Sequence, residues 1–147
     1  MATIYFSGAI SAGRDDVPLY RRIIRMLEED GHRVIAGAVA SEVIGHGGEP
    51  LSPEEIFDRD LEWIAEAARE KGVLVAEVSK PSTGVGYEIA AARYRFGMPV
   101  ICMWRPAHTP RCTAMVAGDR DIELVSYSED GVGGAVRKVC DAIRRLT

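Results

Sequence analysis

The chain has 147 residues, of which 27% are charged and 47% hydrophobic, and its formal net charge is −4. Such a length suits one domain that buries roughly two-thirds of its unfolded surface, so we expect a single domain over residues 1–147. The acidic balance argues against a nucleic acid polymer or an anionic membrane as the main partner, because both favour a basic protein face. A small anion is still allowed, since a local site can be positive on an acidic protein.

The cysteines and histidines form no ligand pattern in the sequence. Cys102, Cys112 and Cys140 follow neither CxxC nor zinc-ligand spacing, and we interpret them as reduced thiols of a cytoplasmic protein. No apolar run approaches the roughly 20 residues of a membrane helix, and the first residues do not resemble a signal peptide. We therefore expect a soluble, unexported protein that needs no metal and no redox cofactor.

The first half of the chain alternates apolar runs with amphipathic segments. Ser52, Pro53 and Glu55 have the spacing of an N-cap, a first helical residue and a capping box. Residues 41–50 are polar and glycine-rich, which is typical of a surface loop or a lid. In chain order we predict a strand at 2–7, a loop at 8–16, a helix at 17–30, a weaker strand at 33–39 and a helix from 53 to about 71.

The stretch from Val73 to Glu88 predicts a strand, a loop and a helix start. The apolar residues around Glu77 are typical of a strand buried on both faces, and the Pro-Ser-Thr-Gly run at 81–84 breaks that strand. We expect the next helix to begin near Gly86, with Glu88 in its first turn. Free backbone N–H groups there favour a phosphate, and the helix dipole would keep Glu88 ionised.

The remaining elements continue the same alternation. We predict a strand at 99–104, a loop at 105–111, a helical turn at 112–117, a strand at 122–127 and a helix at 132–146. Alternating strands and helices indicate an α/β fold, a flavodoxin-like or Rossmann-like doubly wound sheet of about five parallel strands flanked by helices. Ligands of such folds bind beyond the carboxyl ends of the strands, so the loops at 8–16 and 79–86 should meet at one cleft.

Three residues near that cleft are candidates for chemistry, and each has a plainer explanation. Glu88 is either an acid that complements a helix dipole or a nucleophile. Asp60 falls on the apolar stripe of its helix with Ile56 and Ile64, so it either pairs with a buried donor or is a general acid with a raised pKa. Tyr5 either packs in the core or holds a carboxylate in place.

Two carboxylates beside a phosphate loop favour glycosidic chemistry on a sugar phosphate. One carboxylate attacks the anomeric carbon, the other protonates the leaving group, and water then resolves the covalent intermediate. A deoxyribosyl cation is more stable than a ribosyl cation, because the 2′-hydroxyl withdraws electrons. A deoxynucleotide is therefore the easier target.

Three segments resemble a known family: residues 5–10 (YFSGAI), 59–63 (RDLEW) and 75–88 (VAEVSKPSTGVGYE). They are similar to the 2′-deoxynucleoside 5′-monophosphate N-glycosidases (Rcl-like) of the nucleoside 2-deoxyribosyltransferase superfamily. The likeness extends in order through Arg105-Pro106 and residues 113–115 and so covers nearly the whole chain. It implies a homodimer that hydrolyses the N-glycosidic bond of deoxynucleoside monophosphates.

The resemblance also implies roles for individual residues. Glu88 would be the nucleophile, Asp60 the proton donor to the base and Tyr5 the residue that orients Glu88. Thr113 would reach the phosphate of the neighbouring subunit. Substrate or phosphate contacts are expected from Ser7, Gly8, Ser11, Arg14, Ser82, Gly84, Gly86, Thr113 and Met115.

The chain departs from the family pattern at three positions. Ala9 and Ser11 stand where relatives carry serine and arginine, so two phosphate contacts are expected to be lost or replaced, with Arg14 a candidate substitute. Gly37 stands where relatives have histidine. These differences bear on substrate choice and phosphate affinity more than on the chemical step.

Three other functions fit parts of the same pattern. A nucleoside 2-deoxyribosyltransferase would use the same Glu88 intermediate, although transferases of the superfamily take nucleosides without phosphate. A ribonucleotide phosphoribohydrolase of the cytokinin-activating type has a PGGxGTxxE loop that residues 81–88 echo only loosely. A non-catalytic nucleotide-binding module would not need a core-facing Asp60.

Overall fold

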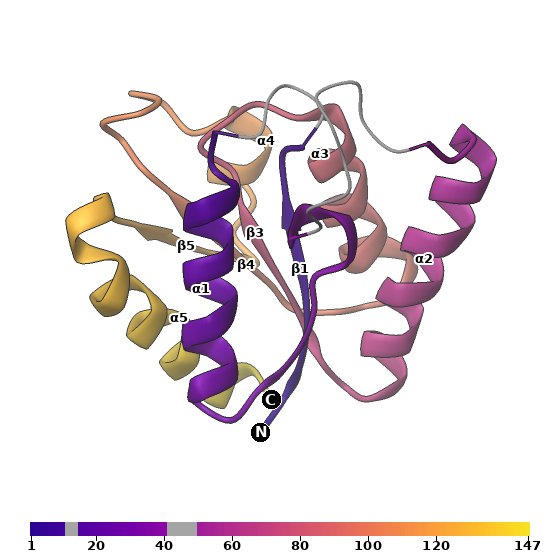
Figure 1. The fold of residues 1–147 in the computed structure, drawn as a ribbon. Helices are drawn as coiled ribbons and strands as arrows, with labels where there is room; N and C mark the ends of the chain where they lie inside the picture. Colours follow the sequence, from indigo (N-terminus) through magenta and orange to yellow (C-terminus); the bar gives the residue numbers. More distant parts are fainter. Residues whose placement is uncertain (11–14, 41–49) are drawn as a thin grey trace.

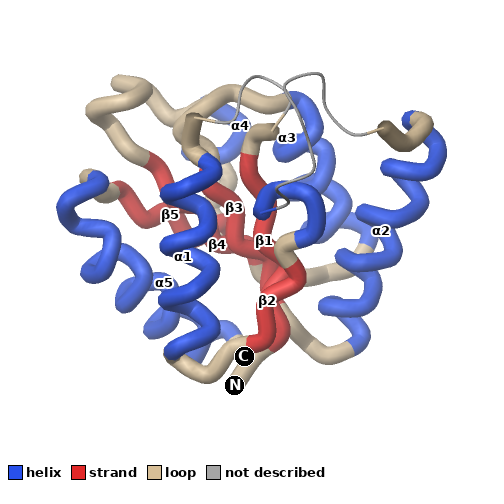
Figure 2. Tube along the Cα trace, in the orientation of Figure 1, coloured by secondary structure: helices blue, strands red, loops and turns tan. Residues whose placement is uncertain are grey.

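The computed structural model describes residues 1–10, 15–40 and 50–147, and it shows a parallel β-sheet between two layers of helices (Figure 1). Five strands pair in the order β2-β1-β3-β4-β5, and every pair is parallel (Figure 2). This is a flavodoxin-like order, and it confirms the predicted α/β class. The strands are β1 Thr3–Gly8, β2 Arg33–Ile35, β3 Val73–Glu77, β4 Val100–Trp104 and β5 Ile122–Ser126.

Helices α1 to α4 connect consecutive strands, α5 follows β5, and together the helices cover both faces of the sheet. Helices α1 and α5 lie on one face, and α2 and α3 lie on the other (Figure 1). Within the part of the chain that the structure describes, no helix is long and apolar enough to cross a membrane. The helices are α1 Val17–Glu29, α2 Pro53–Arg69, α3 Thr83–Ala90, α4 Ala114–Ala117 and α5 Val132–Leu146, with short helical turns η1 Gly37–Ala40, η2 Ala91–Arg95 and η3 Glu129–Gly131.

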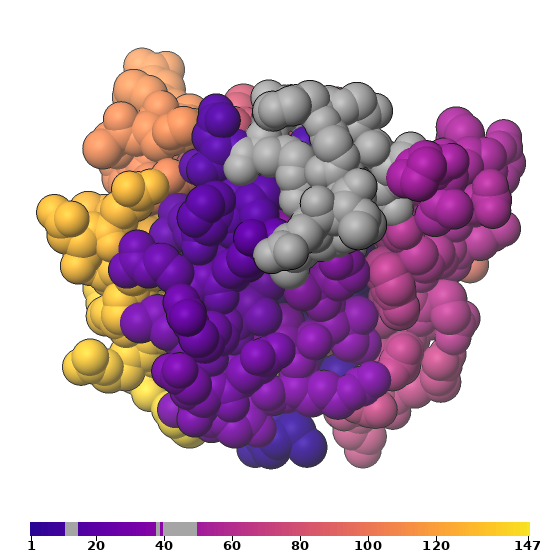
Figure 3. Space-filling view, in the orientation of Figure 1, coloured from indigo at the N-terminus to yellow at the C-terminus, as the bar shows by residue number. Residues whose placement is uncertain are grey.

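Alternation along the strands divides the interior into two apolar cores. Successive side chains of a strand point to opposite faces, so Ile4 and Phe6 of β1 pack toward α1 and α5, while Tyr5 packs toward α2 and α3. In the space-filling view α1 (purple) and α5 (yellow) form one continuous surface (Figure 3). Both faces of β1 and β3 are covered, which confirms the prediction made for the strand around Glu77.

The capping box at the start of α2 is confirmed. The Glu55 N–H donates to Ser52 Oγ at 3.1 Å, and the Ser52 N–H donates to Glu55 Oε1 at 3.1 Å. On the same helix Phe57 is 43% exposed, while Leu61 is buried. The Phe57 ring instead contacts that of Tyr87 on α3, with 6.2 Å between ring centroids.

Two predicted boundaries near the cleft are wrong. Strand β2 ends at Ile35 and not at residue 39, because Gly37 has a φ of +49° and begins the turn η1. Helix α3 begins at Thr83 and not at Gly86, because Ser82 caps it and its Oγ accepts the Val85 N–H at 3.2 Å. The predicted lid at 41–50 lies outside the described residues, apart from Pro50.

A buried ionic network joins the loops that follow four of the strands. Arg105, which is 4% exposed, donates to Glu77 at 2.9 Å, to Asp16 at 2.7 Å and to Glu129 at 2.9 Å. The Tyr127 hydroxyl donates to the same Glu77 carboxylate at 2.5 Å. Removal of one member of such a network leaves an uncompensated buried charge.

We predict that Arg105→Met lowers the free energy of unfolding by about 3–5 kcal/mol, because Glu77 and Asp16 lose their buried cation. Urea denaturation measures this. Arg145→Met is the matched control, since the Arg145–Glu123 pair is exposed and should contribute no more than about 1 kcal/mol. Equal effects of the two changes would contradict a special role for Arg105.

Candidate active site

A cavity of about 560 Å³ opens at the carboxyl end of β1, beside α2 and the start of α3. It contains all three residues that we expected to do chemistry, Tyr5, Asp60 and Glu88. Four of the expected substrate or phosphate contacts also line it: Ser7, Gly8, Ser82 and Gly84. The rest of the wall is mostly apolar and consists of Phe6, Ile10, Ala36, Val39, Ile56, Pro81, Thr83 and Val85.

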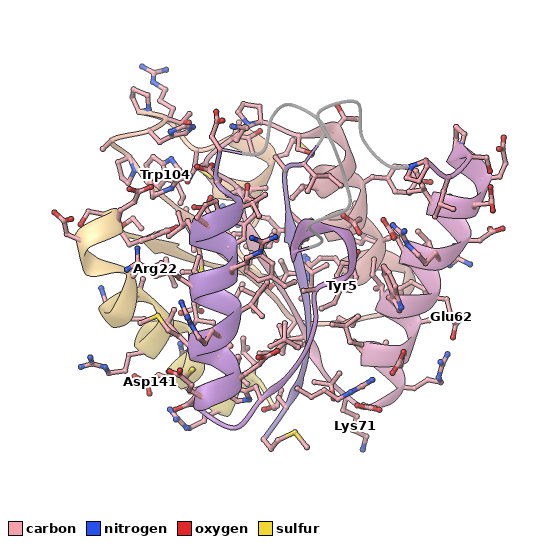
Figure 4. All side chains as sticks on the ribbon, in the orientation of Figure 1. Tyr5, Arg22, Glu62, Lys71, Trp104 and Asp141 are labelled. Atoms are coloured by element: carbon pink, nitrogen blue, oxygen red, sulfur yellow. The ribbon has the colours of Figure 1, made fainter. Side chains whose placement is uncertain are left out.

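Two hydroxyl groups of β1 hold the Glu88 carboxyl group. The Tyr5 hydroxyl donates to Oε2, and the Ser7 hydroxyl donates to Oε1 at 3.0 Å. Tyr5 and Ser7 share one face of the strand because they are two residues apart, and Figure 4 shows Tyr5 in the interior between the sheet and α2. We had assigned Ser7 to the substrate, and its two-residue spacing from Tyr5 was the available signal for this contact.

Burial controls the charge of Glu88. Loss of solvent raises its pKa to about 7, and the negative charge of Asp60 adds to this rise, while the hydrogen bonds from Tyr5 and Ser7 oppose it. Burial therefore outweighs the helix dipole that we expected to keep Glu88 ionised. Because α3 begins at Thr83, Glu88 lies in the second turn of the helix, and the dipole acts mainly within the first turn.

Asp60 faces the cavity and not the apolar core. Its side chain is 21% exposed, and Arg59 contacts its Oδ1 through Nε at 2.9 Å and Nη2 at 2.8 Å. Ile64, one turn further along α2, is fully buried against the sheet. We had not identified Arg59 as a partner of Asp60, although the two are adjacent in the sequence.

Three expected contacts lie in a different groove. Gly86, Thr113 and Met115 line a groove of about 1060 Å³ formed by α3 and α4, and Ser82 borders both this groove and the Glu88 cavity. Thr113 is exposed, and Met115 is 86% exposed. A single chain therefore does not bring Thr113 or Met115 into the cavity that holds Glu88. Ser11 and Arg14 lie outside the described residues.

Potential metal ligands gather at one place in the described part of the chain, away from this cavity. Ligand atoms of Asp30, His32 and Cys140 lie within 4.8 Å of one another. His32 Nδ1 accepts the backbone N–H of Ala2 at 3.0 Å, and Arg144 donates to Asp30 at 3.1 Å. Metal-bound histidines usually donate through their second nitrogen, so this arrangement suits a hydrogen-bonded cluster better than a metal site.

The site therefore defines a class: a doubly wound α/β protein with two carboxyl groups in one cavity at the edge of a parallel sheet. No protein-family model matches the chain. The chain is similar to 5-hydroxymethyl-dUMP N-hydrolases. It is 34% identical to that of the pike Esox lucius, over 92% of this chain and 93% of the pike protein. It is 37% identical to the human protein (95% of this chain, 79% of the human protein) and 33% identical to the mouse protein (95% of this chain, 80% of the mouse protein). The chain belongs to this family of 2′-deoxynucleoside 5′-phosphate N-hydrolases.

We predict that Glu88→Gln raises the free energy of unfolding above that of the wild type by more at pH 8 than at pH 4. The folded pKa of Glu88, about 7, lies above its unfolded value, so the folded state binds the extra proton and wild-type stability falls as the pH rises toward 7. The amide does not titrate, and the variant should gain up to about 3 kcal/mol over the wild type across this range.

The measurement is urea denaturation of both proteins at several pH values between 4 and 8. Glu62→Gln is the control, because Glu62 points into solvent from α2 (Figure 4) and its side chain is 65% exposed. A difference between Glu88→Gln and wild type that does not change with pH would contradict the raised pKa.

Proposed function

We propose that this protein hydrolyses the N-glycosidic bond of 2′-deoxynucleoside 5′-monophosphates and releases a free base and 2-deoxyribose 5-phosphate. The observation that carries the proposal is the Glu88 carboxyl group, held in the cavity by Tyr5 and Ser7 with the Asp60 carboxyl group in the same wall. The names of the relatives support the same reaction class.

Glu88 is the nucleophile in this proposal. One carboxylate oxygen forms a bond to C1′ of the sugar while the bond from C1′ to the base nitrogen breaks, and Asp60 gives the departing base a proton. Water then attacks C1′, gives its proton to Asp60 and releases Glu88. The two hydroxyl donors hold the carboxyl group in one orientation, which reduces the entropy lost on reaching the transition state.

The start of α3 is the proposed phosphate site. The first N–H groups of a helix have no partner inside it and carry partial positive charge, and Ser82, Thr83 and Gly84 all line the Glu88 cavity. A phosphate at this end of the cavity leaves the base to the apolar wall that includes Ile10, Val39 and Ile56.

The free thiols of the chain suit a reducing compartment, and we place the reaction in the cytoplasm.

A second copy of the chain is the proposed partner. Three large apolar side chains, Tyr87, Tyr94 and Met115, are 60%, 79% and 86% exposed on α3, η2 and α4. A surface of this kind is typical of a protein interface. Because Ser82 separates the groove from the Glu88 cavity, a partner seated on this surface would bring its Thr113 close to the phosphate site.

The reaction is tested by chromatographic detection of free base from deoxynucleoside monophosphates, ribonucleoside monophosphates and deoxynucleosides. We expect release from dGMP or another deoxynucleotide, little from GMP or deoxyguanosine, and a loss on the order of a thousandfold or more in kcat with Glu88→Ala. Glu62→Ala should leave the rate unchanged. No release from any deoxynucleotide would refute the proposal, and base exchange on adding a second base would favour a transferase.

The dimer is tested by sedimentation velocity. The wild type is expected at twice the 16.0 kDa of one chain, and Met115→Glu should shift it to the monomer because a charge would be buried in the interface. Base release should fall with the loss of the partner. Leu146→Glu, at an exposed apolar position on α5, is the control, and a monomeric wild type would overturn the proposed partner.

A further inference from the structure

We propose that Arg59 is a positioning residue that aims the Asp60 carboxyl group into the cavity and sets the pH range in which it carries a proton. The Trp63 ring holds Arg59, and Gly37 leaves the space that this ring occupies. The inference rests on the proposed function, because it concerns the proton donor of that reaction. Arg59 itself is not part of the cavity wall, so it acts through Asp60.

The contact between Arg59 and Asp60 is specific in its geometry. Nε and Nη2 of the guanidinium group both reach Oδ1, at 2.9 Å and 2.8 Å. Two donors fix the position of this oxygen, and charge-assisted hydrogen bonds are the stronger ones. Both side chains are mostly shielded from solvent, at 24% and 21% exposed, so the pair is screened less than a surface pair.

An aromatic ring holds the guanidinium group in place. The Arg59 Cζ atom lies 4.6 Å from the centroid of the Trp63 ring, which is the geometry of a cation–π contact. Arg59 and Trp63 are four residues apart on α2 and therefore lie on the same side of the helix. The Trp63 ring thus holds Arg59, which in turn contacts Asp60.

Gly37 leaves the space that the Trp63 ring occupies. A Cβ atom at residue 37 would lie 2.3 Å from ring atom Cζ3, and the φ of +49° is one that other residues rarely adopt. A side chain at residue 37 would therefore require the Trp63 ring to move, and the ring is also the contact of Arg59. The turn after β2 is thereby connected to Asp60 through two side chains, Trp63 and Arg59.

The charges around Asp60 give the pairing a chemical consequence. Arg59 of α2, Glu88 of α3 and Tyr5 of β1 interact with it electrostatically. Burial and the Glu88 carboxylate raise the pKa of Tyr5, which remains a neutral donor. Arg59 favours the ionised form of Asp60 and Glu88 opposes it. With Arg59 in place, Asp60 is a stronger acid and gives up its proton to a departing base more readily.

The direct test is a carbon-detected NMR titration of the Asp60 carboxyl group, assigned with Asp60→Asn. Arg59→Gln should raise its titration midpoint by about 1–3 pH units, because the guanidinium charge is lost. Arg69→Gln is the matched control on the same helix, where the Arg69–Glu62 pair is exposed, and it should leave the midpoint unchanged. An unchanged midpoint in Arg59→Gln would overturn the inference whether or not the protein is a hydrolase.

Kinetics separate positioning from a general structural role. In Arg59→Gln the alkaline limb of kcat/KM for dGMP should move to higher pH, and kcat should fall roughly tenfold with little change in KM. Trp63→Leu and Gly37→Ala should lower kcat but move the limb less, since they keep the charge. Arg59→Lys should restore the limb but only part of kcat, because an ammonium group has no two-donor fork. A lower kcat with a comparable change in KM, and no shift of the alkaline limb, would indicate a structural role only and would overturn the inference.

Discussion

The position of the cavity depends on one buried cation. Arg105 follows β4 and pairs with Glu77 at the end of β3 and with Asp16 before α1, while Tyr127 after β5 donates to the same Glu77. Ser79 joins this network, since its Oγ accepts the Arg105 N–H at 2.8 Å. The proposed phosphate loop begins immediately after Ser79. The position of Ser79, where this loop begins, therefore depends on the ion pairs of Arg105, and breaking these pairs would leave a buried charge uncompensated.

The two carboxyl groups of the cavity lie in different surroundings. Burial raises the pKa of Glu88 although two hydroxyl groups donate hydrogen bonds to it, whereas Asp60 contacts a guanidinium group, whose charge favours the ionised carboxylate. Surroundings that separate two titrating groups are the usual way in which a fold assigns acid and base roles. In the free protein these surroundings favour a proton on Glu88 and a charge on Asp60, whereas the proposed reaction needs an ionised Glu88 and a protonated Asp60. Gly37, outside the cavity, leaves room for the Trp63 ring that contacts Arg59, the partner of Asp60.

Much of the fold could be predicted because local signals agreed with the tertiary structure. The alternation of apolar strands and amphipathic helices indicated the parallel sheet, and Ser52 with Glu55 marked the start of α2 correctly. The start of α3 was misplaced because Thr83 and Gly84 are poor helix formers, yet the Ser82 cap and the burial of Val85 extend the helix toward them. Strand β2 was predicted too long because a glycine allows a positive φ but does not require one, and at Gly37 the structure adopts it.

By itself, the sequence determined the order of the elements, the edge of the sheet where we expect a ligand and the candidate residues Tyr5, Asp60 and Glu88, because strand and helix periods and the family motifs are local in the chain. Only the tertiary structure decided what these residues contact. The Ser7 bond to Glu88 and the separation of Thr113 from the cavity depend on segments that are distant in sequence. The pKa of Glu88 likewise depends on how much solvent the packed helices exclude, and no local pattern encodes that burial.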